Sequence, residues 1–308
     1  MTFGDFWPIY FQKKELMVKR TTLAAYDLAW HGNLEQYFHN VEMDDVKPSD
    51  IQTFVDNRLR ERCCSVKTLR DKIIVLKNML KIYALSYDLP AREYPLVWPS
   101  QNKNLDSKPR EKFTDQELTR LMEYCKNSPD HLTKLIALVA MTGMRIGEAS
   151  GLQFGDFDFE KKMIHVQRTV SRVYFSSKGE SEILIGPPKS VHSNRFIPVP
   201  DWLCRYYKNY QKLFKLPDDA FITPNTSKSA LEPRTMRPLY YKVCEKAGVR
   251  RLPFHCLRHT YASRLILSKA DIRTVAELLG HADVAVTLNI YSHSDNDRKS
   301  AIAKKIFL

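Results

Sequence analysis

The stretch that decides the fold is Pro253 followed by residues 254–259, Phe-His-Cys-Leu-Arg-His. The proline favours the start of a helix at this point. His255 and Arg258 are three residues apart, so a helix presents both side chains on one face. An imidazole beside a guanidinium packs poorly in a core, but one phosphate group accepts hydrogen bonds from both. The stretch therefore predicts a helix with a phosphate-binding face.

A zinc site is the alternative for the same helix, because His255 and His259 are four residues apart. A hydrolytic zinc helix carries a glutamate directly after the first histidine, where this sequence has Cys256. Arg258 also brings a positive charge toward any metal held there. We therefore expect no metal at this helix.

Two further motifs follow toward the C-terminus. Residues 278–283 read Leu-Leu-Gly-His-Ala-Asp, and residues 290–293 read Ile-Tyr-Ser-His. Gly280 is predicted to end a helix, which leaves His281 at a sharp turn. Asp283 can then cap a helix that ends near Tyr291. Taken singly, His281 can equally be an ordinary turn histidine, and Tyr291 an ordinary core or surface tyrosine.

A fourth motif lies upstream, where residues 142–148 read Thr-Gly-Met-Arg-Ile-Gly-Glu. It sets Arg145 between an apolar helix and a second helical turn. The simple alternative is that Arg145 only pairs with Glu148, because side chains three residues apart on a helix meet.

Residues 113–308 are predicted to form a domain of helices around a small antiparallel β-sheet. Thr114 and Glu117 form a capping box that starts a helix. The other patterns predict helices over 115–126, 131–144, 201–214 and 233–247, and strands over 163–168, 170–175, 182–185 and 195–199.

Residues 1–99 are predicted to form a separate helical domain. Its helices are expected to start at Thr21 or Thr22, after a cap at Ser49 and after a cap at Ser65. The polar, proline-containing residues 100–112 are predicted to be the linker. The fold class is therefore mainly α, with an α+β second domain.

The charge of the chain indicates a polyanionic partner. The 308 residues carry a formal charge of +13. Residues 1–106 hold 15 Lys and Arg against 14 Asp and Glu, whereas residues 107–308 hold 33 against 21. The six cysteines form no Cys-x-x-Cys pair, and no apolar run is long enough to span a bilayer. We expect a cytoplasmic, nucleoid-associated protein with no membrane partner.

One helix of the first domain carries its own basic stripe, made of Lys67, Arg70, Lys77 and Lys81. At about 100° per residue, the four side chains project within an arc of roughly 80°. A stripe of this kind is commonly a solvated surface. Here it lies opposite an apolar face, which suits a helix docked along DNA phosphates.

Taken together, the four motifs resemble the tyrosine recombinase, or phage integrase, family. The resemblance covers roughly residues 107–308 by motif, with order and spacing both in agreement. It implies a two-domain clamp on duplex DNA, in which the first domain is the core-type DNA-binding domain. It also implies that Arg145, His255, Arg258 and His281 are catalytic and that Tyr291 is the nucleophile. The family's catalytic lysine matches Lys189, ahead of Arg195-Phe196-Ile197-Pro198, with Lys178 as the alternative.

The resemblance implies a site-specific recombinase that cuts and rejoins DNA through a 3′-phosphotyrosine and a Holliday junction, without metal or ATP. The partners it implies are double-stranded DNA with specific sites and three further copies of the chain, forming a homo-tetramer on two duplexes. In that assembly the C-terminal residues 301–308 dock into a neighbouring subunit, and docking onto their own domain is the alternative. A type IB topoisomerase and a catalytically idle DNA-binding protein are the competing interpretations.

Overall fold

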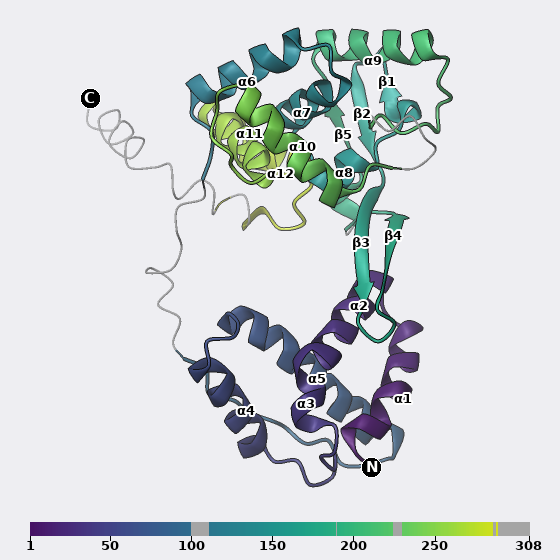
Figure 1. The fold of residues 1–308 in the computed structure, drawn as a ribbon, viewed down its shortest axis with the longest axis vertical. Helices are drawn as coiled ribbons and strands as arrows, with labels where there is room; N and C mark the ends of the chain where they lie inside the picture. The colour runs from purple at the N-terminus through teal and green to yellow at the C-terminus, as the bar shows by residue number, and fades with distance from the viewer. Residues whose placement is uncertain (100–110, 189, 224–229, 286–287, 289–308) are drawn as a thin grey trace, which may run out of the picture. The chain divides into compact units, whose positions relative to one another are not determined.

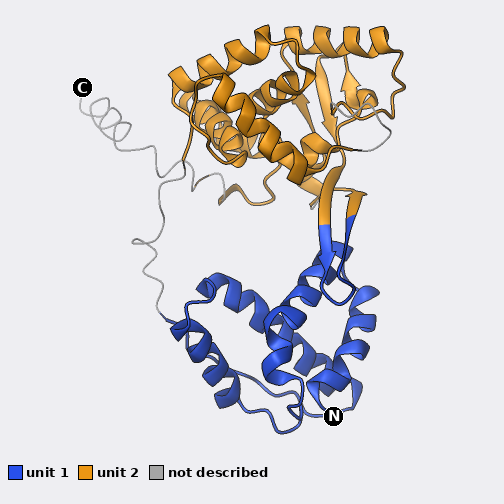
Figure 2. Ribbon diagram, viewed as in Figure 1, with its two compact units in different colours: residues 1–102, 173–182 blue, residues 103–172, 183–308 orange. Residues whose placement is uncertain are grey.

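The computed structural model describes residues 1–99, 111–188, 190–223, 230–285 and 288 (Figure 1). The chain divides into two compact units, one made of residues 1–102 with 173–182 and the other of residues 103–172 with 183–308 (Figure 2). The expected boundaries at residues 99 and 113 remain a prediction, and the linker lies mostly outside the described residues. The grouping of residues 173–182 with the first unit was not expected. Within the described residues, no helix combines the length and apolar character needed to cross a bilayer.

The first unit is built from helices around an aromatic core. They are α1 (Phe3–Glu15), α2 (Arg20–Ala29), the π-helix η1 (Trp30–Leu34), α3 (Glu35–Phe38), α4 (Pro48–Arg60) and α5 (Val66–Ser86). The rings of Trp7 and Trp30 stack with centroids 5.2 Å apart at the centre of this core. Helix α1 was not predicted. Pro8 lies inside it, and four buried side chains, Phe3, Phe6, Trp7 and Tyr10, offset the missing hydrogen bond.

Two of the predicted helix caps in this unit have different outcomes. Ser65 is confirmed, since its hydroxyl accepts a hydrogen bond from the Thr68 amide at 3.1 Å. Ser49 is wrong as a cap, because α4 already begins at Pro48. Proline suits the first helical position, where its missing N–H costs nothing, and the Asp50 carboxylate accepts a hydrogen bond from the Lys47 amide at 2.9 Å.

Residues 173–182 make specific contacts within the first unit. The Arg20 guanidinium lies 5.1 Å from the Phe175 ring centroid and pairs with Glu182. The buried Asp27 carboxylate accepts a hydrogen bond from the Ser177 amide at 3.0 Å. These contacts explain why this segment groups with the helices.

The second unit surrounds one buried helix, α7 (His131–Thr142), which is apolar on nearly every face. The remaining helices are α6 (Asp115–Asn127), α8 (Ile146–Ser150), α9 (Asp201–Phe214), α10 (Pro233–Lys246), α11 (His255–Leu267) and α12 (Ile272–Leu279), with 3-10 turns η2 (Phe154–Asp156) and η3 (Val191–Ser193). The capping box at Thr114 and Glu117 is confirmed by hydrogen bonds of 2.9 and 3.2 Å.

The strands of the chain form two small sheets among the described residues. They are β1 (Phe157–Asp158), β2 (Met163–Val166), β3 (Thr169–Phe175), β4 (Glu180–Gly186) and β5 (Arg195–Pro198). Strands β3 and β4 each run from one unit into the other. Strands β1, β2 and β5 pair antiparallel in that order, with Ile164 opposite Ile197 in the core, and β3 pairs with β4. The small antiparallel sheet is therefore confirmed, with β1 as an additional short strand.

Candidate active site

Arg145 is positioned by the end of α7. The helix ends at Thr142, two residues before the predicted end, because the next residue, Gly143, adopts a φ of +64°. A side chain there would meet Tyr261, since a Cβ on Gly143 would lie 2.4 Å from the Tyr261 ring. The chain then turns so that Arg145 becomes the N-cap of α8. The short Gly143 turn thus delivers Arg145 from the buried helix to the surface of a pocket.

Arg145 makes three contacts that orient its guanidinium. Nη1 donates to Glu148 Oε1 at 2.7 Å and to the Ser193 hydroxyl at 3.4 Å. Nη2 donates to the Gly280 carbonyl at 3.0 Å. The Arg145–Glu148 pair is therefore present, but the side chain of Arg145 stays 38% exposed toward the pocket.

Arg258 lies on α11 and is only 3% exposed. Nη1 donates to the Gly143 carbonyl at 2.8 Å, and Nη2 donates to the Leu279 carbonyl at 2.5 Å. Burial, followed by the charge of Arg145, lowers the pKa of Arg258 to about 9. A cation this poorly solvated gains from an incoming anion.

The last turn of α12 brings His281 to the same place. Gly280 has a φ of +64° and ends the helix, as predicted, and the His281 amide donates back to the Ala276 carbonyl at 3.0 Å. Asp283 also caps as predicted, because its carboxylate accepts a hydrogen bond from the Ala285 amide at 2.8 Å. Burial, and then the charges of Arg258, Arg145, Arg195 and His255, lower the pKa of His281 to about 4. His281 is therefore neutral at pH 7.

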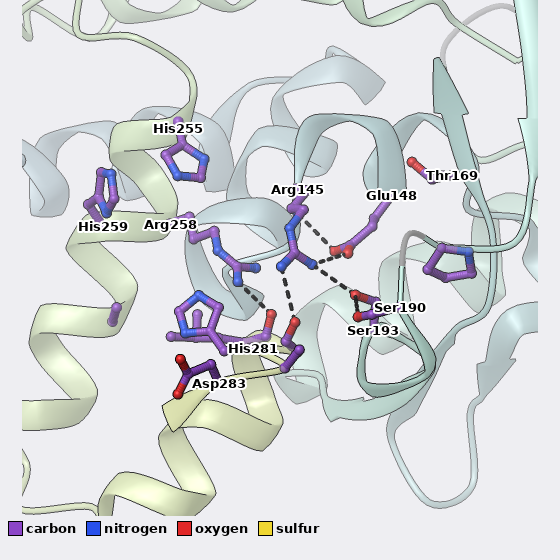
Figure 3. Close-up of a pocket in the computed structure, with 15 residues that line it drawn as sticks. Arg145, Glu148, Thr169, Ser190, Ser193, His255, Arg258, His259, His281 and Asp283 are labelled. Carbon is purple, nitrogen blue, oxygen red and sulfur yellow. Dashed lines mark hydrogen bonds and ion pairs between the residues drawn. The ribbon is translucent and has the colours of Figure 1, made fainter. Parts of the chain in front are cut away.

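One pocket, about 810 Å³ in volume, brings together four of the predicted residues. Its lining includes Arg145, His255, Arg258 and His281, which reach it from three different helix ends (Figure 3). The lining also contains polar residues that sequence reasoning did not assign: Glu148, Thr169, Ser190, Ser193 and His259. Ser190 and Ser193 follow the predicted Lys189 by one and four residues, and this closeness in sequence is the signal that could have indicated them.

Three successive carbonyl oxygens at the end of α12 hold three arginines. Each carbonyl accepts a hydrogen bond from a different guanidinium. The pairs are Leu278 with Arg195 at 2.7 Å, Leu279 with Arg258 at 2.5 Å and Gly280 with Arg145 at 3.0 Å. The final carbonyls of a helix have no partner within the helix and carry partial negative charge, which explains the gathering of cations.

Two predicted residues, Lys189 and Tyr291, lie outside the described residues. The two neighbours of Lys189 in sequence, Pro188 and Ser190, line the pocket. The alternative, Lys178, belongs to residues 173–182, which group with the first unit.

The four residues of the basic stripe on α5 differ in their contacts. Arg70 lies against the Trp98 ring, 5.0 Å from its centroid, and Lys77 donates a hydrogen bond to the Tyr94 carbonyl. Lys67 and Lys81 are exposed. That this helix contacts DNA phosphates stays a prediction. Lys67 and Lys81 are the two residues to which it most directly applies, because they are exposed.

The described residues contain no group of three or more His, Cys, Asp or Glu side chains that could hold a metal ion. His255 and His259 contact each other instead, with ring centroids 4.5 Å apart and nearly perpendicular planes.

Comparison with known proteins identifies the class. Residues 111–298 match the phage integrase family, and residues 2–59 match the phage integrase N-terminal SAM-like domain. The chain therefore belongs to the phage integrase family of tyrosine recombinases and is a DNA strand transferase.

Among the relatives is a tyrosine recombinase XerC-like protein of Caldanaerobacter subterraneus subsp. tengcongensis, 29% identical, with 95% of this chain and 79% of the relative covered. The transposase from transposon Tn916 of Enterococcus faecalis is 25% identical, with 86% of this chain and 67% of the relative covered.

Solved structures share the fold. A Tn1549 transposon integrase in complex with a circular intermediate DNA superposes with a TM-score of 0.74 at 19% identity, covering 99% of both chains. A lambda integrase tetramer bound to a Holliday junction superposes with a TM-score of 0.60 at 16% identity, covering 94% of this chain and 77% of that chain.

Proposed function

We propose that this chain is a site-specific DNA recombinase that cuts DNA through a covalent 3′-phosphotyrosine on Tyr291. The observation that carries the proposal is the single pocket that contains Arg145, His255, Arg258 and His281. Two guanidinium groups and two imidazoles on one cavity wall match the several acceptor oxygens of a phosphodiester.

The reaction needs charge neutralisation, a nucleophile and a proton for the leaving oxygen. Arg145 and Arg258 neutralise the non-bridging oxygens, and His281, which lines the same pocket, donates a further hydrogen bond. The Tyr291 oxygen forms a bond to phosphorus as the bond from phosphorus to the 5′ oxygen breaks. We assign the phenol's proton to His255 and the proton for the 5′ oxygen to Lys189, because a lysine ammonium releases a proton more readily than the delocalised guanidinium of Arg145.

The cut exchanges one phosphoester for another, so a 5′ hydroxyl from a second DNA can reverse it without ATP. Two such exchanges produce and resolve a Holliday junction. We propose that the two units clamp the duplex and that four copies act on two duplexes. The lambda integrase tetramer on a Holliday junction, which shares the fold, supports this assembly.

The test is Tyr291→Phe on a nicked suicide substrate in EDTA and without nucleotide. We expect unchanged DNA affinity and complete loss of the covalent protein–DNA adduct, because only the nucleophilic hydroxyl is removed. Tyr241→Phe, which removes a hydroxyl of the same unit outside the pocket lining, is the control and keeps the adduct. An adduct formed by Tyr291→Phe, or cleavage only with added metal, contradicts the proposal. Relaxation of supercoils without exchange between two sites would indicate a topoisomerase instead.

A further inference from the structure

Arg195 differs from the other two arginines at the end of α12, because it does not line the pocket. Its side chain is 6% exposed, and it lies on β5 beneath the site. Its guanidinium nevertheless contacts the structures that hold both Arg145 and His281. It donates to both oxygens of Glu148, at 3.3 and 3.0 Å, to the Ser193 carbonyl at 2.9 Å and to the Leu278 carbonyl at 2.7 Å.

We infer that Arg195 is a positioning residue that ties Glu148 to the end of α12 and so sets Arg145 and His281 at the spacing the phosphate requires. This inference rests on the proposed cleavage chemistry. Arg195 acts through its neighbours and does not contact DNA.

The first argument concerns the charge of Glu148, which is 2% exposed and lies between two guanidinium groups. Burial raises the pKa of Glu148, but the charges and hydrogen bonds of Arg195 and Arg145 outweigh this and hold the pKa below its ordinary value. Without Arg195, the full negative charge of Glu148 falls on Arg145. Arg145 would then be drawn toward the carboxylate and offer less positive charge to the phosphate.

The second argument concerns the turn before His281. A Cβ on Gly280 would lie 2.9 Å from Arg195 Nη1 and 3.1 Å from the His192 carbonyl oxygen. Arg195 therefore packs directly against this turn and leaves no space for a side chain. Lysine keeps the charge but has three donors on a single nitrogen, so it cannot make the four hydrogen bonds by which Arg195 joins both Glu148 oxygens to the Ser193 and Leu278 carbonyls.

The experiment compares Arg195→Lys, Arg195→Met and the double variant Arg195→Met with Glu148→Gln. Single-turnover cleavage of a suicide substrate is measured at saturating protein, with DNA affinity and thermal melting measured in parallel. The matched control is Arg250→Lys, because Arg250 also grips a buried glutamate, Glu117, with two hydrogen bonds of 2.6 and 2.9 Å, outside the pocket lining.

We expect Arg195→Lys to cleave roughly 10²-fold more slowly at nearly unchanged DNA affinity, because small displacements of reacting groups cost about this much. Arg195→Met should be slower still, and removal of the Glu148 charge in the double variant should recover part of the loss. Arg250→Lys should cleave at the wild-type rate.

A histidine titration supplies a readout that a purely structural role would not move. Burial and the charges of Arg258, Arg145, Arg195 and His255 lower the pKa of His281 to about 4. Loss of the Arg195 cation removes one repulsive charge, so the His281 pKa in folded, DNA-free Arg195→Met should rise toward its ordinary value. Labelled-histidine NMR measures this shift, with Arg250→Lys again as the control.

Wild-type cleavage by Arg195→Lys overturns the inference, as does an equal loss in Arg250→Lys or an unmoved His281 titration in folded Arg195→Met. Failure of the wild-type protein itself to form an adduct would contradict the proposed function instead.

Discussion

At the scale of single residues, the proposed reaction gives Lys189 a different role from that of the arginines. We propose that Arg145 and Arg258 stabilise charge on the phosphate, whereas Lys189 supplies the proton that the departing 5′ oxygen needs, because lysine can release one. Lys189→Ala should therefore slow cleavage by roughly 10²- to 10⁴-fold. A 5′-bridging phosphorothiolate needs little protonation to leave, so this substrate should restore the rate of Lys189→Ala. The measurement is single-turnover cleavage of matched oxygen and sulfur substrates.

Lys178→Ala is the matched control for this prediction, because Lys178 is the alternative lysine in the sequence. We expect it to cleave both substrates at the wild-type rate. Equal rescue of Arg145→Ala by the phosphorothiolate would show that Lys189 has no special role as an acid.

At the scale of elements, the end of α12 explains why the charged side chains converge. Leu278, Leu279 and Gly280 each offer a carbonyl to a guanidinium, so the helix terminus is satisfied and the arginines are oriented by the same hydrogen bonds. The cations also match the negative end of the helix dipole. The pocket is thus preorganised before any phosphate binds.

Helix α5 leads to a prediction about DNA binding. Only Lys67 and Lys81 of its basic stripe are exposed, since Arg70 and Lys77 contact Trp98 and Tyr94. Each phosphate contact contributes about −0.9 to the slope of log K against log salt. Removing both exposed lysines should therefore make the slope shallower by about 1 to 2, measured by DNA binding over a salt series.

Lys13→Ala with Lys212→Ala is the charge-matched control, because it removes two lysines from other helices. A slope that is the same in wild type and in the Lys67 and Lys81 variant would mean that the stripe is only solvated.

At the scale of the whole molecule, the C-terminal segment bears on assembly. Residues 301–308, Ala-Ile-Ala-Lys-Lys-Ile-Phe-Leu, lie outside the described residues, and Ile302 and Ile306 would share one edge of a helix. So short a helix is not stable alone and needs a surface to dock on. We predict that deleting residues 301–308 leaves single-site DNA binding unchanged but lowers synapsis and coordinated strand exchange. Gel-shift and two-site recombination assays separate the two effects.

Lys304→Ala with Lys305→Ala is a control that keeps the apolar edge and should recombine better than the deletion. Normal recombination by the truncated protein, or its unfolding, would show that the segment does not dock on a neighbouring subunit.

Much of the fold could be predicted from local sequence patterns. The Ser65 cap, the Thr114 capping box and the left-handed conformation of Gly280 depend on interactions between residues close in sequence. Each could therefore be predicted from the adjacent residues. Helix α1 was not. Pro8 argues against a helix locally, and the aromatic core that overrides it is assembled from distant segments.

The sequence by itself determined the family and the mainly helical organisation, and it predicted the four residues Arg145, His255, Arg258 and His281 that line one pocket, because motif spacing and periodicity are local properties of the chain. Only the tertiary structure decided that Arg195 from β5 joins Glu148 and the Leu278 carbonyl, and that Arg70 turns toward Trp98. The physical reason is that both contacts join segments that are distant in the sequence. The buried Arg195 guanidinium needs partners for its N–H groups, and those partners lie wherever the fold brings carbonyls and carboxylates. The Arg70 guanidinium gains a cation–π contact where the fold brings the Trp98 ring.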